Sequence, residues 1–241
     1  MSLLDKVCVI TGAGSGIGRS IARRFKAEGG TLVLVDIDGP RLAKVADELE
    51  AEAVEMDVTD PDQVAALFDR PRVDVLCNNA GVLDKLTPLA EVDDAMWRKV
   101  MSVNVDAPFM ACRAVLPKMM EQGGGAIVNT CSAASLSGGR AGAAYTASKH
   151  ALLGITRSIA WYYGPAGVRC NAMAPGAIQT KMQMRDIPHT GGMERYAAYF
   201  QTIPPHGKAM DVAEVALFLA SDASRYVNGA VVPVDGGWNA F

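Results

Sequence analysis

The sequence is short of the patterns that several classes of protein require. It has five cysteines and three histidines in 241 residues, with no Cys-x-x-Cys pair, and the spacings of His150, His189 and His206 match no zinc motif. It also lacks the Gly-x-Ser-x-Gly elbow that carries the serine of many hydrolases. These absences argue against a disulfide framework and against a metal or serine hydrolase. We expect reduced thiols and no metal site.

Neither sign of charge is in excess, and no long apolar run is present. The chain has 23 Lys and Arg against 26 Asp and Glu, a net charge of −3, with no basic patch that would favour nucleic acid. No apolar segment is long enough to cross a bilayer, and Asp5 and Lys6 interrupt the N-terminus before a signal-peptide core forms. We therefore expect a cytoplasmic protein without nucleic-acid or membrane partners.

What the sequence does contain is a regular alternation of β-rich runs and helical periods. Most of the runs are continuously apolar, which is typical of strands buried on both faces of a parallel sheet. The predicted strands span residues 7–11, 31–36, 53–58, 73–78, 125–131, 168–174 and 230–235. Helical stripes such as Ile17, Ile21 and Phe25 lie between them, and Gly29-Gly30 ends the first helix. The alternation predicts an α/β fold with a doubly wound sheet, in one domain over residues 1–241.

The segment 176–210 breaks this pattern. It has no clear strand and is rich in glycine, proline, methionine and aromatic residues. Segments of this kind often close over an active site, and the alternative is a helix pair packed on the surface. Lys181, Arg185 and Arg195 could meet an anionic group, although such residues are more often solvated. We favour a substrate loop and leave the substrate open.

A glycine-rich turn joins the first strand to the first helix. Gly12, Gly16 and Gly18 are spaced so that the backbone can approach a pyrophosphate at the helix N-terminus, where free N–H groups and a positive dipole end favour an anion. Asp36 ends the second strand, where a carboxylate can accept hydrogen bonds from the ribose of NAD and repel a 2′-phosphate. No cation at Ser15 or Ile37 offsets it. We predict dinucleotide binding with NAD as the cofactor.

Tyr145 and Lys149 are four residues apart and share one helix face. A neighbouring ammonium favours the phenolate and lowers the pKa of a tyrosine, so the pair can act as a general acid and base on an alcohol or carbonyl. Ser132 precedes them at the end of a predicted strand and could hydrogen-bond the same substrate oxygen. The plain alternatives are an amphipathic helix surface and a loop cap.

Taken together, these motifs resemble the classical short-chain dehydrogenases/reductases over essentially the whole chain. The matching residues are Thr11, Gly12, Gly16, Gly18, Asp57-Val58, Asn78-Asn79-Ala80-Gly81, Asn104, Ser132, Tyr145, Lys149, Pro175-Gly176, Ile178, Thr180 and Val234-Asp235-Gly236-Gly237. The resemblance implies a single-domain extended Rossmann fold of seven parallel strands. It also implies a homotetramer or homodimer, with helices at 93–121 and 145–163 at one interface and the C-terminal strand at another.

The resemblance also assigns roles. Tyr145 would be the acid/base, Lys149 would bind the nicotinamide ribose and lower the pKa of Tyr145, Ser132 would polarise the substrate oxygen and Asn104 would hold a water. The residues that would line the cofactor site are Gly12, Ser15, Gly16, Ile17, Gly18, Asp36, Asp57, Val58, Asn79, Ala80, Gly81, Tyr145, Lys149, Pro175, Gly176, Ile178 and Thr180. For Asn104 the residues themselves offer only Pro108, which should interrupt the helix that starts near Asp93.

Two departures from the family pattern are visible. Cys131 stands where many members have a second serine, and we expect a buried small residue there rather than a nucleophile. The segment 203–208 lacks the usual leucine-glycine-arginine after Ile-Pro, which bears on loop closure and on a subunit contact. The predicted activity is hydride transfer between NAD(H) and a secondary alcohol or ketone. A non-catalytic NAD sensor on the same fold is the alternative.

Overall fold

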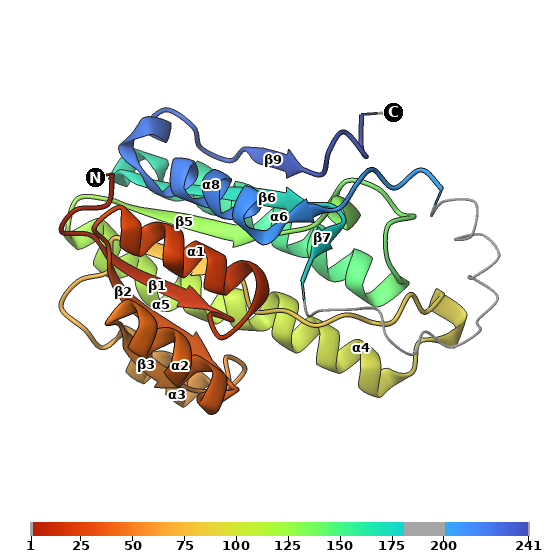
Figure 1. The fold of residues 1–241 in the computed structure, drawn as a ribbon, viewed down its shortest axis with the longest axis horizontal. Helices are drawn as coiled ribbons and strands as arrows, with labels where there is room; N and C mark the ends of the chain where they lie inside the picture. The colour runs from red at the N-terminus through yellow and green to blue at the C-terminus, as the bar shows by residue number, and fades with distance from the viewer. Residues whose placement is uncertain (1, 181–200, 241) are drawn as a thin grey trace.

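A seven-stranded sheet forms the centre of the computed structural model, which describes residues 2–180 and 201–240. Its strand order is β3-β2-β1-β4-β5-β6-β9, and all neighbours are parallel. The strands are β1 Val7–Thr11, β2 Thr31–Asp36, β3 Glu52–Glu55, β4 Val75–Asn78, β5 Gly125–Thr130, β6 Val168–Pro175 and β9 Val231–Val234. The predicted α/β class and parallel Rossmann-type sheet are confirmed (Figure 1).

Helices cover both faces of this sheet. They are α1 Gly16–Ala27, α2 Gly39–Leu49, α3 Pro61–Phe68, α4 Asp94–Met101, η2 Ser102–Asp106, α5 Ala107–Glu121, α6 Ala143–Tyr163 and α8 Ala209–Ala220, with short 3₁₀ turns η1 Leu89–Glu91, η3 Ala133–Ser135, η4 Gly164–Ala166 and η5 Asp222–Ser224. Asp38, Asp60 and Asp93 cap α2, α3 and α4 by accepting hydrogen bonds from backbone N–H groups of the first turn. The starts of these three helices are therefore determined by residues close to them in sequence.

The two main apolar cores correspond to the two layers of helices. On one face α1, α2 and α8 pack on the sheet through side chains such as Phe25, Leu42 and Leu219. On the other face α3, α5 and α6 do so through side chains such as Phe68 and Val115. Figure 1 shows α1 beside α8 on one side of the sheet. Because both faces are covered, the central strands are buried, as their apolar runs predicted.

A buried amide network fixes α6 against the sheet. Asn78 of β4 and Asn129 of β5 are paired in register, and the Asn78 Nδ2 donates to Asn129 Oδ1 at 2.9 Å. Asn129 Nδ2 in turn donates to Thr156 Oγ1 of α6 at 2.9 Å. Fully satisfied buried networks favour one arrangement over others. This network fixes the position of α6 along the direction of the strands, relative to the ends of β4 and β5.

The helix at 93–121 and the segment 176–210 differ from expectation. The helical run is interrupted near Asn104, as predicted, but by a π-helical turn in Ser102–Asp106, and Pro108 lies in the first turn of α5, where its missing N–H is tolerated. Most of the predicted substrate loop, with Lys181, Arg185 and Arg195, lies outside the described residues. Its described ends contain the two-residue parallel strands β7 Ile178–Gln179 and β8 Gly207–Lys208, which are too short to leave a pattern in the sequence.

Candidate active site

The glycine turn lies at the carboxyl end of β1, where the strand order reverses between β1 and β4. Gly12 and Gly16 have φ angles of +67° and +54°, which favour glycine. A Cβ on Gly18 would lie 2.1 Å from the Gly12 carbonyl oxygen, so only glycine lets α1 approach the turn this closely. The turn and the first N–H groups of α1 thus form an open anion cradle that fits a pyrophosphate.

Asp36 braces the same turn. Its Oδ2 accepts a hydrogen bond from the Gly14 N–H at 2.8 Å, and its Oδ1 accepts one from the Asp38 N–H at 3.0 Å. A carboxylate has further lone pairs, so a ribose hydroxyl can still be accepted. Asp57 instead caps its own loop by accepting hydrogen bonds from Thr59, while Val58 lies beside it at the cavity wall.

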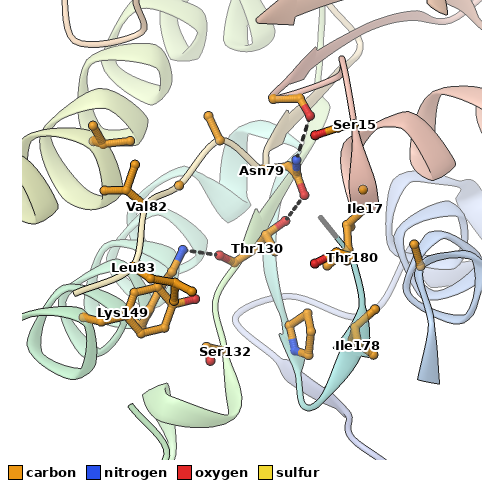
Figure 2. Close-up of a pocket in the computed structure, with 18 of the residues that line it drawn as sticks. Ser15, Ile17, Asn79, Val82, Leu83, Thr130, Ser132, Lys149, Ile178 and Thr180 are labelled. Carbon is orange, nitrogen blue, oxygen red and sulfur yellow. Dashed lines mark hydrogen bonds between the residues drawn. The ribbon is translucent and has the colours of Figure 1, made fainter. Parts of the chain in front are cut away.

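Asn79 ties the cradle to the neighbouring strands. Its Nδ2 donates to the backbone oxygens of Thr11 and Gly12, and its Oδ1 accepts a hydrogen bond from the Thr130 hydroxyl at 3.5 Å. The Lys149 ammonium donates to the carbonyl oxygen of Thr130 at 2.8 Å. Figure 2 shows these contacts running from Lys149 through Thr130 to Asn79. They connect the glycine turn with the helix that carries Tyr145.

Tyr145 and Lys149 share one face of α6, as their spacing predicted. Lys149 is buried, and its Nζ lies 5.6 Å from the centre of the Tyr145 ring. Ser132 caps the short turn η3 by accepting the Ala134 N–H, so the loop-cap interpretation is correct, yet the same side chain also faces the cavity. The Ser132 hydroxyl therefore caps η3 and also lines the cavity.

Burial controls the titration of this group. It raises the pKa of Tyr145 to about 12, against a hydrogen bond with Ser132 that lowers it, and the charges of Cys131 and Asp84 raise it further. Burial also lowers the pKa of Lys149 to about 8. The shift of Tyr145 is opposite in direction to the expected one, because burial is its largest cause. Burial likewise raises the pKa of the Cys131 thiol, as befits a buried residue that is not a nucleophile.

Asn104 lies behind the cavity wall within the π-helical turn. Its Oδ1 accepts the Val82 N–H at 2.9 Å, and its Nδ2 donates to the Val82 carbonyl and to Ser148 Oγ. A Cβ on Gly81 would lie 3.2 Å from Asn104 Oδ1 and 3.6 Å from Lys149 Nζ. The side chain of Asn104 thus anchors the segment after β4 against α6.

One continuous cavity of about 1640 Å³ joins the glycine turn to Ser132 and Tyr145. Every residue assigned from the sequence to cofactor or catalysis lines it except Gly18 and Asn104, which support its wall. Pro175, Gly176, Ile178 and Thr180 close it from β6 and β7. A Cβ on Gly16 would lie 3.5 Å from Thr180 Cβ, so this segment sits against the glycine turn.

Several residues of the cavity have no signal in the sequence motifs. Arg41 and Lys44 of α2 line its Asp36 end, and Arg41 pairs with Asp38 at 3.1 Å. At the Ser132 end Arg140 donates to the Trp238 carbonyl at 2.6 Å and lies 4.2 Å from the centre of its ring, while Trp238 Nε1 donates to Thr202. The helix start at Asp38-Gly39-Pro40 could have indicated Arg41. The position of Trp238 depends on tertiary packing alone.

The parallel sheet and the glycine cradle at its strand-order reversal together define a Rossmann-type nucleotide-binding fold. A family model described as enoyl-(acyl carrier protein) reductase matches residues 12–239. The chain is 38% identical to 3beta-hydroxysteroid dehydrogenase 2 of Eggerthella lenta over 99% of this chain and 96% of that one. It is 39% identical to a galactitol 2-dehydrogenase (L-tagatose-forming) of Cereibacter sphaeroides, over 99% and 97%.

Solved structures agree with these relatives. The crystal structure of levodione reductase superposes with a TM-score of 0.88 at 37% identity, covering 99% of each chain. A Beutenbergia cavernae protein provisionally described as an NAD(P)-dependent gluconate 5-dehydrogenase, with NADP bound at low occupancy, superposes with a TM-score of 0.89 at 39% identity, over 100% of this chain and 99% of that one. The protein belongs to the classical short-chain dehydrogenases/reductases, and it is an oxidoreductase that acts on CH–OH groups.

Among the described residues, no helix is long and apolar enough to cross a membrane and no group of side chains suits a metal ion.

Proposed function

We propose that the protein oxidises a secondary alcohol to a ketone with NAD, or carries out the reverse reduction, through Ser132, Tyr145 and Lys149. The observation that supports this most is the single cavity that places the Ser132 and Tyr145 hydroxyls at one end and the glycine turn with Asp36 at the other. When bound, NAD supplies a hydride acceptor, and NADH a hydride donor. The glycine turn and Asp36 would hold its adenosine half, and Lys149 its nicotinamide ribose.

The protein's own part is the movement of one proton. In oxidation Tyr145 Oη removes the proton of the substrate hydroxyl, while Ser132 Oγ donates a hydrogen bond to the same oxygen. In reduction Tyr145 Oη returns that proton to the carbonyl oxygen. Because the pKa of Tyr145 is raised to about 12, the phenol is protonated at neutral pH and is ready for reduction. We therefore expect kcat for oxidation to rise with pH up to the pKa of Tyr145.

Replacement of Tyr145 by phenylalanine tests the assignment. Tyr145→Phe removes the acid/base but keeps the ring, so turnover should fall at least a thousandfold while binding of NADH, measured by fluorescence, stays unchanged. Tyr162→Phe is the matched control, since Tyr162 is exposed near the end of the same helix. Near-normal turnover by Tyr145→Phe would refute the role of Tyr145.

For the cofactor we propose NAD(H) rather than NADP(H). Asp36 lies at the cavity wall at the end of β2, where its charge opposes a 2′-phosphate. Steady-state kinetics should give a higher kcat/KM with NAD than with NADP, and Asp36→Asn should reduce that ratio about tenfold or more. Asp47→Asn on the exposed face of α2 should leave the ratio unchanged. A clear preference of the wild type for NADP would contradict the proposal.

The alternative of a non-catalytic NAD sensor is less well supported. A sensor has no need for a serine hydroxyl, a phenol and a buried ammonium around one end of the cavity. A panel of secondary alcohols, followed by NADH absorbance, decides between the two. Binding of NAD by calorimetry with no turnover on any alcohol or ketone would favour the sensor.

We further propose that the chain acts as one domain, as a homotetramer or homodimer, in the cytoplasm. Cofactor and acid/base residues alternate along the chain, which supports one domain. Large apolar side chains are exposed on α4, α5 and α6, among them Trp97, Phe109 and Trp161, which supports an interface there. All five cysteines are free and buried, as in proteins of reducing compartments.

A further inference from the structure

The helix that carries Tyr145 is capped by a distant segment. The N-cap position of α6 is Gly142, which has no side chain to satisfy the first N–H groups of the helix. Two acceptors come instead from the turn Asp84–Thr87, after β4. Asp84 Oδ2 accepts the Tyr145 N–H at 2.8 Å, and the Thr87 carbonyl accepts the Ala143 N–H at 3.0 Å.

The capping turn is strained. Lys85 and Leu86 have φ angles of +56° and +61°, although neither is glycine. The turn is closed by the N–H and the hydroxyl of Thr87, which both donate to the Asp84 carbonyl oxygen, and it is anchored by the buried Leu86 side chain. Left-handed backbone is unfavourable for L-amino acids with a side chain and persists only where the surroundings enforce it. Backbone strain that persists beside the candidate active site indicates that this turn holds the start of α6 in place.

Asp84 itself is enclosed at the helix end. It is only 1% exposed, and a Cβ on Gly142 would lie within 2.5 Å of both carboxylate oxygens. Burial raises the pKa of Asp84, while the backbone N–H groups of Tyr145, Leu86 and Gly142 lower it. The carboxylate therefore faces the positive end of the α6 dipole, where a negative charge is favoured.

We propose that Asp84 is a positioning residue, which fixes the backbone of Tyr145 and thereby the distance of its phenol from Ser132 and Lys149. This inference rests on the proposed role of Tyr145 as acid/base. The proposal requires one direct contact between the two residues, the hydrogen bond that the Tyr145 N–H donates to the Asp84 carboxylate. A displacement of about 1 Å at a reacting group can cost a hundredfold in rate, so loss of this cap should appear in kcat.

Asp84 also contributes charge next to the phenol. The titratable groups that face Tyr145 are Lys149 on its own helix, Cys131 after β5 and Asp84 on the turn. Of these, Cys131 and Asp84 both oppose formation of the phenolate. Asp84→Asn keeps an amide oxygen for the Tyr145 N–H but removes the charge, so it separates position from charge.

The experiment compares Asp84→Ala, Asp84→Asn and Asp93→Ala. Asp93 caps α4 by accepting the Met96 N–H at 2.7 Å and is therefore a matched cap on a helix without Tyr145. Asp84→Ala should lower kcat at least tenfold, with the Kd for NADH within about twofold of wild type. Asp84→Asn should keep most of kcat and move the alkaline pKa of the rate profile downward. Asp93→Ala should leave both kcat and this pKa unchanged.

Three results overturn the proposal: wild-type kcat in Asp84→Ala, a parallel loss of NADH binding in that variant, or equal damage by alanine and asparagine.

Two readouts do not depend on turnover. Hydrogen exchange at the N-terminal peptide of α6 should quicken in Asp84→Ala alone, and the ultraviolet titration of Tyr145, taken as the difference from Tyr145→Phe, should shift downward in Asp84→Asn. If Tyr145→Phe stays active, the proposed function fails while these two readouts still decide whether Asp84 holds Tyr145.

Discussion

At the scale of single residues, the site combines a phenol that is hard to ionise with an ammonium that is hard to keep charged. Both shifts have one cause, since burial penalises a phenolate and an ammonium alike. Lys149 keeps its place through one hydrogen bond to the Thr130 carbonyl. The buried ammonium therefore lowers the stability of the folded protein at neutral pH.

Lys149→Met should make this cost visible. Below pH 8 Lys149 is charged in both states, and only the folded state holds that charge away from water; well above pH 10.5 it is neutral in both states. The variant should therefore gain about 2 kcal/mol in the free energy of unfolding at pH 7, after the lost hydrogen bond is counted, and the gain should shrink as pH rises from 8 toward 10.5. Chemical denaturation at pH 7 and at higher pH measures it. An unchanged or lower stability at pH 7 would contradict this account of burial.

At the scale of elements, the site depends on how closely helices approach strand ends. The start of α1 meets the turn after β1 at Gly18, and the start of α6 meets the capping turn at Gly142. Each contact requires a glycine because a Cβ would overlap backbone or carboxylate atoms. The amide network from Asn78 to Thr156 then holds α6 in position relative to the ends of β4 and β5.

Gly18→Ala tests the first of these contacts. The added methyl would meet the Gly12 carbonyl at 2.1 Å, so the turn must move; we expect a loss of about 1–3 kcal/mol in stability and at least tenfold weaker NADH binding. Gly154→Ala is the control, because Gly154 lies in α6 with nothing within 4 Å of its added Cβ. That variant should gain about 1 kcal/mol with unchanged binding. Equal behaviour of the two variants, measured by thermal unfolding and fluorescence titration, would show that the close approach at Gly18 is unimportant.

At the scale of the whole molecule, several large apolar side chains are exposed on the described surface. Trp97 and Phe109 are partly exposed on α4 and α5, Trp161 and Tyr162 are largely exposed on α6, and Tyr226 is fully exposed before β9. The Arg113 guanidinium lies 5.0 Å from the centre of the Phe109 ring, so a cationic group adjoins an exposed apolar one, as interfaces often have.

Light scattering tests the proposed assembly. Wild type should have the mass of four chains of 25.4 kDa, or of two if only one interface forms. Phe109→Asp would place a charge among the exposed apolar side chains of α4 and α5, so the mass should fall by half or more, whereas Ala43→Asp at an exposed position of α2 should not change it. A monomeric wild type would refute the homo-oligomer.

Much of this protein is determined by local sequence. The predicted β-rich runs overlap every strand of the main sheet, although β3 is Glu52–Glu55 rather than 53–58 and is mostly exposed. Aspartate caps mark three helix starts, and the glycine turn, Asp36, Tyr145 and Lys149 line the same cavity. These features depend on residues close in sequence, whose geometry is fixed by strand and helix periods. The interruption near Asn104 was predictable as well, although a proline rule did not identify the π-helical turn.

Other features depend on residues far apart in the chain. The direction of the Tyr145 pKa shift follows from how completely α6 and the strand ends enclose the phenol, which no spacing records. The cap from Asp84 reaches Tyr145 across 61 residues, and the contact of Arg140 with Trp238 spans 98. Sequence periodicity fixes which side chains share an element, but burial and long-range contacts exist only once the elements have packed, and these decide how the site titrates and what holds it in place.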